Sequence, residues 1–402
     1  MQKQASPQRG KYLIIGTTVL FFTGIIYAWS ILKAPFSSEF GWSSSALSWN
    51  FTLTMSFFCL GGVLGSVLSK KFRIKQILTF AGLLSGGGFL AVSALSGDSI
   101  LPLYFCYSIL GGLGIGIAYN VVISVVNKWF PDKKGLCTGC LMMGFGISTL
   151  ILGNISNLLF RLPRFGWRAT YVLIALLLAS ALFLCSRILK QPDIPFESPE
   201  VKVNDRSLQE KSGISPREMI KTGSFWKVFF CMTFLAAVGS FVISIAKDLA
   251  LASGANDNFS AVLVGVLSVC NGLGRIFSGA LFDYAGRRRT FLFTNIVTIF
   301  AAIVILLAVG QQLLWLCIVG LILTGISYGS CPTIAAAFTS DFYGWKYYST
   351  NFSIMSFTLM TASFISAGMN ILLTHTENYQ TVFLFLLILS IIALFFNLSV
   401  KK

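Results

Sequence analysis

The chain has 402 residues, of which 55% are hydrophobic and 11% are charged, and its mean hydropathy is +0.79. A soluble domain carries about 25% charged residues, so this composition excludes an ordinary soluble protein. The net charge of +16 would suit a nucleic-acid-binding protein. The charges are confined to short tracts between apolar runs, however, and we expect no nucleic-acid partner.

The apolar runs are each about twenty residues long, which is enough to cross a bilayer as an α-helix. They predict an all-α polytopic membrane protein. Twelve spans are expected, at approximately residues 12–32, 46–69, 77–97, 101–126, 136–158, 167–187, 225–246, 260–282, 290–309, 313–336, 351–373 and 379–398.

Lysine and arginine are distributed unevenly between the two sides of the predicted bundle. The termini and the connections on their side carry 24 of the 30 basic residues, and the connections on the other side carry five. Basic residues accumulate on the cytoplasmic side of membrane proteins. We therefore expect both termini in the cytoplasm and the chain in a bacterial cytoplasmic (inner) membrane.

Two halves are predicted, at 1–190 and 223–402, joined by a cytoplasmic linker at 191–222 that is rich in proline and mixed charge. An internal repeat supports the division, because Gly65 to Lys75 after the second span resembles Gly279 to Arg289 after the eighth, 214 residues later. Parallel six-helix repeats around a central site are a transporter architecture.

Arg275 lies within the eighth span, where a guanidinium is costly and cannot lose its charge. The chain has no Asp or Glu at mid-membrane depth in another span, so an anionic ligand is the natural partner. The alternative is an arginine that packs helices or bonds backbone carbonyls. Asn271 lies one turn earlier on the same face. It could donate to a carboxylate or hold the guanidinium.

Other motifs carry no expected chemistry. Cys137-x-x-Cys140 lacks a second pair and a nearby histidine, so no metal is expected, and the nine cysteines fit helix packing. Gly111 to Gly116 has no preceding strand and predicts close helix contact. No nucleophile–base pair shares a membrane depth, and neither enzymatic activity nor a cofactor is expected.

The turn Gly279-x-x-x-Asp283-x-x-Gly286-Arg287 resembles the signature of the major facilitator superfamily between its helices 8 and 9. Within that superfamily, the chain is similar to the oxalate/formate antiporter family over nearly its whole length. The similar stretches are Tyr27-Ala-Trp29-Ser, Trp129-Phe-Pro-Asp-Lys-Lys-Gly-Leu, Asn271-Gly-x-x-Arg275 and Asn351-Phe-Ser. The resemblance implies the twelve-helix major facilitator fold.

The resemblance also implies site residues. Arg275 matches the family's substrate-binding arginine, and aromatic positions lining its central cavity are matched by Tyr27, Tyr119 and Tyr328. Phe145 stands where the oxalate exchanger has a tyrosine, and Leu359 stands where it has a second cation, a lysine. Asp283 and Arg287, at the cytoplasmic end of the eighth span, are expected to act as gate residues.

These residues together predict a secondary transporter of small monocarboxylates, such as formate, lactate or pyruvate, which works as a monomer by alternating access in the lipid bilayer. Oxalate–formate exchange is the alternative within the class, and Leu359 is the argument against it. A non-transporting carboxylate sensor and an efflux pump for organic anions are alternatives of other kinds. Without a mid-membrane acid, exchange, uniport or symport without a dedicated proton relay is expected.

Overall fold

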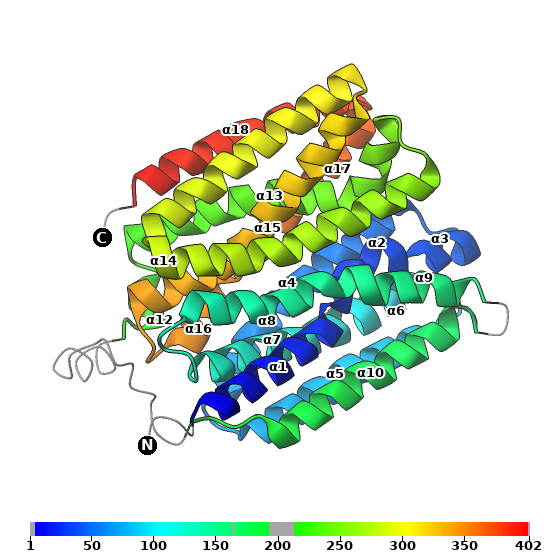
Figure 1. The fold of residues 1–402 in the computed structure, drawn as a ribbon. Coiled ribbons are helices and arrows are strands. Elements are labelled where there is room, and N and C mark those ends of the chain that lie inside the picture. Colours follow the sequence, from blue (N-terminus) through cyan, green and yellow to red (C-terminus); the bar gives the residue numbers. More distant parts are fainter. Residues whose placement is uncertain (1–4, 163–164, 193–212, 401–402) are drawn as a thin grey trace.

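In the computed structural model, which describes residues 5–162, 165–192 and 213–400, the chain forms long helices packed side by side (Figure 1). The described residues contain no strand. Among the described residues, eleven helices are long and apolar enough to cross a membrane. One of them, α14 (Asp257–Gln311), contains two spans, because Gly286 has non-helical backbone angles (φ 77°, ψ 174°) and folds the chain back. The prediction of twelve spans is therefore confirmed.

The N-terminal half contains six spans, and three of them change helix type along their length. The first, fourth and fifth spans each combine α-helix with a 3-10 or π-helical turn. The elements are α1 (Ala5–Thr23), η1 (Gly24–Ala28), α2 (Trp29–Leu32), α3 (Ala34–Phe40), α4 (Ser44–Leu68), α5 (Ile74–Val92), α6 (Leu101–Leu103), η2 (Tyr104–Gly111), α7 (Gly112–Asn127), α8 (Lys134–Ser148), η3 (Thr149–Gly153), α9 (Asn154–Phe160) and α10 (Gly166–Ile188).

The C-terminal half lies beside the N-terminal half, with both chain ends and α12 at the same edge of the bundle (Figure 1). We call this edge the terminal side. Besides α14, the elements of the C-terminal half are α12 (Pro216–Met219), α13 (Gly223–Ala252), α15 (Leu314–Tyr343), α16 (Tyr348–Met355), α17 (Phe357–Thr376) and α18 (Tyr379–Leu398).

Several predicted boundaries are wrong by a few residues. The third span was expected to end at residue 97, but α5 ends at Val92. The seventh was expected to end at 246, but α13 continues to Ala252 through Lys247 and Asp248. Hydropathy detects the apolar part of a helix, whereas backbone hydrogen bonding continues into polar residues.

Most of the expected linker, residues 193–212, lies outside the described residues. Its last part is attached to the C-terminal half. Ser215 caps α12 in a reciprocal capping box with Glu218. The backbone N–H of Ile214 donates to the carbonyl of Tyr343 at 3.0 Å.

The predicted close packing of glycines is confirmed. A Cβ atom added to Gly116 would lie 2.0 Å from the carbonyl oxygen of Phe58, and one added to Gly61 would lie 2.4 Å from that of Leu113. The backbones of α4 and α7 therefore touch, which is possible only without side chains at these positions. This contact brings the second and fourth spans together.

Candidate central anion site

Arg275 lies in the first segment of α14 and is 1% exposed. It packs against α8, where glycines leave room for it. A Cβ atom at Gly139 would lie 2.4 Å from the Arg275 carbonyl oxygen, and one at Gly146 would lie 3.3 Å from the guanidinium Nε. The small residues of α8 thus create the space in which the arginine side chain lies between the two halves.

The guanidinium of Arg275 is only partly hydrogen-bonded. Its Nη1 donates to the carbonyl of Met142 at 3.0 Å, and its Nε donates to Oδ1 of Asn271 at 3.4 Å. The Nη2 atom is buried and has no hydrogen-bond partner. No ion pair joins Arg275 to an acidic residue in the described part of the chain. A buried donor without a partner is costly, so this atom is a natural point of contact for a ligand.

The predicted aromatic residues converge on this arginine. The Arg275 guanidinium carbon lies 5.9 Å from the ring centroid of Tyr27. The Tyr27 ring lies 5.2 Å from Phe145 and 6.4 Å from Tyr328, and Phe145 lies 5.2 Å from Tyr119. Residues from spans one, four, five, eight and ten therefore meet at one place.

Three further aromatic residues belong to the cluster and were not identified from the sequence. Phe58 lies 5.0 Å from Tyr119 between ring centroids, Phe352 lies 6.2 Å from Tyr119, and Phe51 lies 6.4 Å from Tyr27. Phe352 belongs to the Asn-Phe-Ser stretch that carries the family resemblance. Phe51 and Phe58 have no such signal, because aromatic residues are common throughout these spans.

A small cavity reaches this cluster from the side opposite the termini. Its free volume is about 40 Å³, which is enough for a few water molecules. Tyr27 lines it, and Lys33 is its one basic residue. Ser363, Ser366 and Asn370 of α17 also line it, at helical spacing that could have been recognised in the sequence. A second cavity of about 20 Å³ adds Ser268 and Asn271.

The terminal side of the site is closed by contacts between the halves. The Asp283 carboxylate accepts hydrogen bonds from the backbone N–H groups of Gly135, at 2.9 Å, and Leu136, at 2.8 Å. A second contact between the halves joins α7 to α16. Nδ2 of Asn120 donates to the Ser353 hydroxyl at 2.9 Å, and the Ser349 hydroxyl donates to Oδ1 of Asn120 at 2.7 Å. The described protein is therefore closed towards its termini.

Arg287, the second expected gate residue, lies on the second segment of α14. Its guanidinium carbon lies 5.3 Å from the ring centroid of Phe342 and 6.0 Å from that of Phe338. Arg287 thus packs on aromatic rings of α15, and its Nη1 has no hydrogen-bond partner.

Leu359 is 6% exposed and lies on α17, one turn before the cavity-lining Ser363. Within the described residues, Arg275 is the one lysine or arginine that is buried.

Cys137 and Cys140 are free thiols on α8, and the described residues contain no group of three or more His, Cys, Asp or Glu that could hold a metal.

Two helical halves around a central site with one buried cation define a class of protein, the multi-pass membrane transporters. The family model of the Major Facilitator Superfamily matches residues 14–244 and 229–402. The chain belongs to this superfamily and is one of its transporters. A solved structure of the proton:xylose symporter XylE, bound to 6-bromo-6-deoxy-D-glucose, has the same fold, with a TM-score of 0.71 over 98% of this chain and 97% of that one. Its sequence identity of 14% shows the fold alone.

Curated relatives are closer in sequence. The oxalate:formate antiporter of Oxalobacter formigenes is 25% identical over 390 residues, which are 95% of this chain and 89% of that protein. Monocarboxylate transporter 1 of Rattus norvegicus is 26% identical over 206 residues, which are 51% of this chain and 40% of that protein. The expected family resemblance is confirmed.

Proposed function

We propose that this chain transports small monocarboxylate anions, of the formate, lactate or pyruvate kind, and that Arg275 pairs with the carboxylate. One observation carries the proposal. Arg275 is buried between the halves, and its Nη2 has no partner. A carboxylate is the planar anion that a guanidinium binds through two parallel hydrogen bonds.

The residues around Arg275 fit such a ligand. The ring of Tyr27 faces the guanidinium, and Tyr119 and Tyr328 belong to the same aromatic cluster. Their phenol groups can donate to a carboxylate without adding charge. Phe145 adds apolar surface for the remainder of a small organic acid, and Leu359, one turn before the cavity-lining Ser363, is expected to add more. Oδ1 of Asn271 accepts a hydrogen bond from Nε of Arg275. This contact supports the second of the two roles expected for Asn271, which is to hold the guanidinium in place.

Binding also gives a reason for the site to close. An empty site leaves a buried positive charge without a counter-charge, whereas a bound monocarboxylate neutralises it and removes part of that cost. The cavity opens away from the termini and the terminal side is held by Asp283, which is one of the two states that alternating access requires. The basic residues on the terminal side support a cytoplasmic location of both termini, and with it a bacterial inner membrane.

Oxalate–formate exchange is the second candidate, because the oxalate:formate antiporter resembles this chain over most of its length. A dianion bound at Arg275 would leave one negative charge without a buried cation, since Leu359 occupies the position of the exchanger's lysine. We therefore rank monocarboxylate transport first.

The test is uptake of radiolabelled formate, lactate, pyruvate and oxalate into proteoliposomes, with and without a counter-anion inside. We expect saturable uptake of a monocarboxylate, and its loss in Arg275→Gln. The control variant is Arg289→Gln, which removes the same charge from an exposed position. Transport of oxalate alone would support the second candidate. Monocarboxylate uptake that survives Arg275→Gln would contradict the proposed site.

A further inference from the structure

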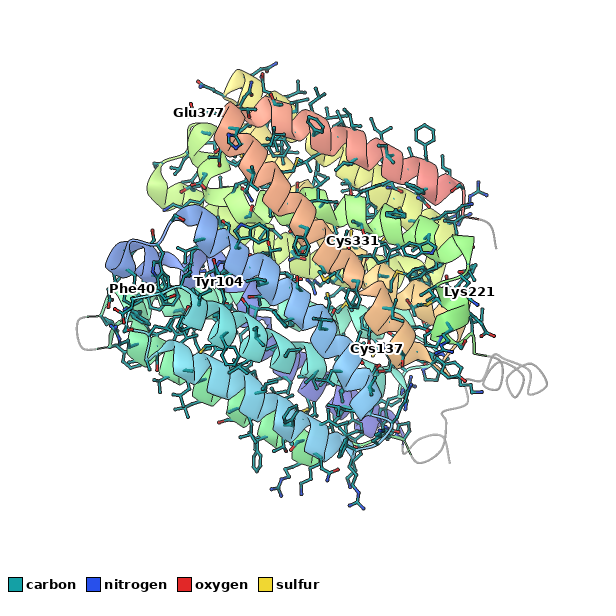
Figure 2. The ribbon with its side chains drawn as sticks, turned by 180° about the vertical axis from the view of Figure 1, so that it is seen from behind. Phe40, Tyr104, Cys137, Lys221, Cys331 and Glu377 are labelled. Carbon is teal, nitrogen blue, oxygen red and sulfur yellow. The ribbon has the colours of Figure 1, made fainter. Side chains whose placement is uncertain are left out.

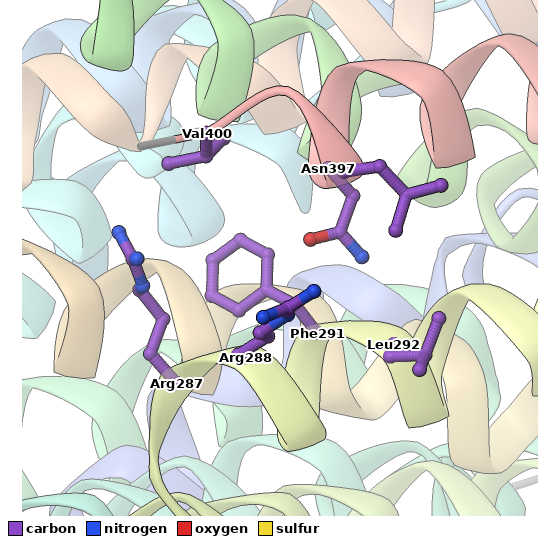
Figure 3. A pocket seen from close by; sticks show the side chains of 7 residues that line it. Arg287, Arg288, Phe291, Leu292, Asn397 and Val400 are labelled. Carbon is purple, nitrogen blue, oxygen red and sulfur yellow. The ribbon is translucent and has the colours of Figure 1, made fainter. Parts of the chain in front are cut away.

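Two basic grooves lie on the outer surface of the bundle at its terminal side, one on each half. The first lies between the second segment of α14 and the last turn of α18, and has a volume of about 400 Å³ (Figure 3). We call it the α14–α18 groove. Arg287 and Arg288 project into it beside Phe291, and Asn397 and Val400 face them from the C-terminal end of the chain (Figure 3).

The second groove lies between the start of α5 and the end of α10, with a volume of about 520 Å³. We call it the α5–α10 groove. Its basic residues are Arg73, Lys75 and Arg187, and its apolar walls include Phe80 and Phe183.

The two grooves occupy equivalent places in the internal repeat. The offset of 214 residues that relates the halves carries Arg73 onto Arg287. Each groove is formed by the third and the last span of its half, and each combines basic side chains with aromatic and aliphatic walls. A basic groove is present in both halves. Arg275, in contrast, occurs only in the C-terminal half, because Gly61 stands at the corresponding position of the N-terminal half. The grooves therefore belong to the scaffold that the halves share.

Two of the arginines in the grooves pack on aromatic rings, and no acidic residue lines either groove. The guanidinium carbon of Arg187 lies 4.8 Å from the ring centroid of Phe183, and that of Arg287 lies 5.3 Å from Phe342. Arg288 in the α14–α18 groove and Arg187 in the α5–α10 groove are exposed. Both grooves thus offer guanidinium donors to an external anion.

The surfaces next to the grooves are apolar and exposed. Leu83 is 70% exposed beside the α5–α10 groove, and Leu398 is 60% exposed beside the α14–α18 groove. In a membrane protein such side chains face acyl chains. The grooves therefore lie where the apolar surface of the bundle meets its basic terminal side, which is the level of lipid headgroups.

We propose that each groove binds one anionic phospholipid, with its phosphate on the arginines and its acyl chains along the neighbouring apolar side chains. A phosphodiester accepts hydrogen bonds from guanidinium groups in a bidentate geometry. Basic pockets between membrane helices attract anionic headgroups, with about 1 kcal/mol for each Lys or Arg near the surface. A free anion would use the arginines but gain nothing from the apolar walls, so the groove chemistry favours a lipid.

The test is native mass spectrometry of the delipidated full-length protein during titration with phosphatidylglycerol. We expect two tightly bound lipids. Arg288→Gln should weaken one of them about fivefold, Arg187→Gln the other, and the double variant both. The matched controls are Arg289→Gln and Lys71→Gln, which remove the same charge from exposed neighbouring positions outside the groove linings. All four substitutions are at exposed side chains, and an unchanged Tm shows that each variant is folded.

Two further titrations distinguish the source of the anion. Phosphatidylcholine, which has the same tails and a neutral headgroup, should bind weakly, and inorganic phosphate should not displace phosphatidylglycerol. Equal weakening in the control variants would mean general surface attraction and would overturn the proposal. Equal binding of phosphatidylcholine, or displacement of the lipid by inorganic phosphate, would overturn it as well.

Discussion

At the scale of single residues, the main energetic problem is the buried charge of Arg275. Moving an arginine to the centre of a membrane helix costs a few kcal/mol even on insertion scales. The Met142 carbonyl and the Asn271 side chain offset part of this cost, and Nη2 remains unsatisfied. Helix packing alone gives no reason to keep an incompletely bonded charge at this position. Pairing with a transported anion, as proposed, would give such a reason.

Arg275→Gln should abolish carboxylate binding and leave the protein folded. Removing one partner of a buried, hydrogen-bonded charge pair costs about 2–5 kcal/mol, which is roughly thirtyfold or more in affinity. Arg275→Lys should also bind poorly, because an ammonium lacks the planar pair of donors. Isothermal calorimetry with the transported anion measures both, with Arg289→Gln as the control. Unchanged affinity in Arg275→Gln would refute the ligand role.

Leu359 sets the expected valence of the substrate. With one buried cation, a monocarboxylate should compete for uptake and oxalate should compete poorly, because the second carboxylate would be desolvated without a partner. Leu359→Lys should shift competition towards dicarboxylates, whereas the control Leu359→Met, which keeps the apolar volume, should not. The measurement is inhibition of labelled uptake by each unlabelled acid. Strong competition by oxalate in the unmodified protein would contradict this prediction.

At the scale of elements, the contact between α8 and α14 links the site to the closed terminal side. The same two helices carry the Gly139–Arg275 contact at the centre and the Gly135–Gly279 contact further out, where a Cβ atom on Gly279 would lie 2.2 Å from the Gly135 carbonyl oxygen. Asp283 accepts two N–H groups at the start of α8. A carboxylate at a helix N-terminus is favoured by the helix dipole, so we propose that Asp283 stabilises the closed state.

Asp283→Asn should therefore favour opening on the terminal side. The variant loses a charge-assisted pair of hydrogen bonds, and we expect amide hydrogen exchange at Gly135 and Leu136 to become roughly tenfold faster, equivalent to about 1.4 kcal/mol. Hydrogen–deuterium exchange with mass spectrometry measures this change. Asp341→Asn, at an exposed position near the terminal end of α15, is the matched control. If both variants exchange at the same rate as the unmodified protein, Asp283 does not stabilise the closed state.

At the scale of the whole molecule, the described residues that line the two central cavities include no Asp or Glu. Glu377 and Phe40, next to Glu39 in sequence, are labelled near the end of the bundle opposite Lys221 (Figure 2). Glu39 forms an ion pair with Arg168 at 2.8 Å, and hydrogen bonds from Arg168 and Trp167 hold the pKa of Glu39 below its usual value. Glu39 therefore stays ionised near neutral pH, and any stability it contributes is lost only as the pH falls through that lowered pKa.

Transport should accordingly occur as exchange, as uniport, or as symport without a dedicated mid-membrane proton carrier. Arg275 cannot release its proton at a relevant pH. The measurement is uptake into liposomes under an imposed pH gradient, repeated after separate neutralisation of five acids at or near the ends of the expected spans, Glu39, Asp98, Asp248, Asp257 and Asp283. We expect no single neutralisation to abolish proton coupling while preserving exchange. One acid with that effect would show that a proton relay exists.

The sequence alone determined the class of protein, the twelve spans and the presence of a charged residue, Arg275, within a span, because each depends on local information. A span is recognised from about twenty consecutive residues, and a charge within it is conspicuous wherever its neighbours lie. Recognition of the aromatic residues required the family resemblance, since one tyrosine in a membrane helix resembles any other. Helix ends were less accurate because hydropathy does not measure backbone hydrogen bonding.

Only the tertiary structure decided which residues meet. Helix packing between segments far apart in the chain makes the Met142 carbonyl a partner of Arg275 and places Phe58 against Tyr119. It also decides that the cavity opens away from the termini. The same is true of the α5–α10 groove, whose basic residues Arg73 and Arg187 are separated in the chain by four spans and the three connections between them. Such contacts depend on small residues that let two helices approach, and their partners are chosen by the shape of the whole bundle.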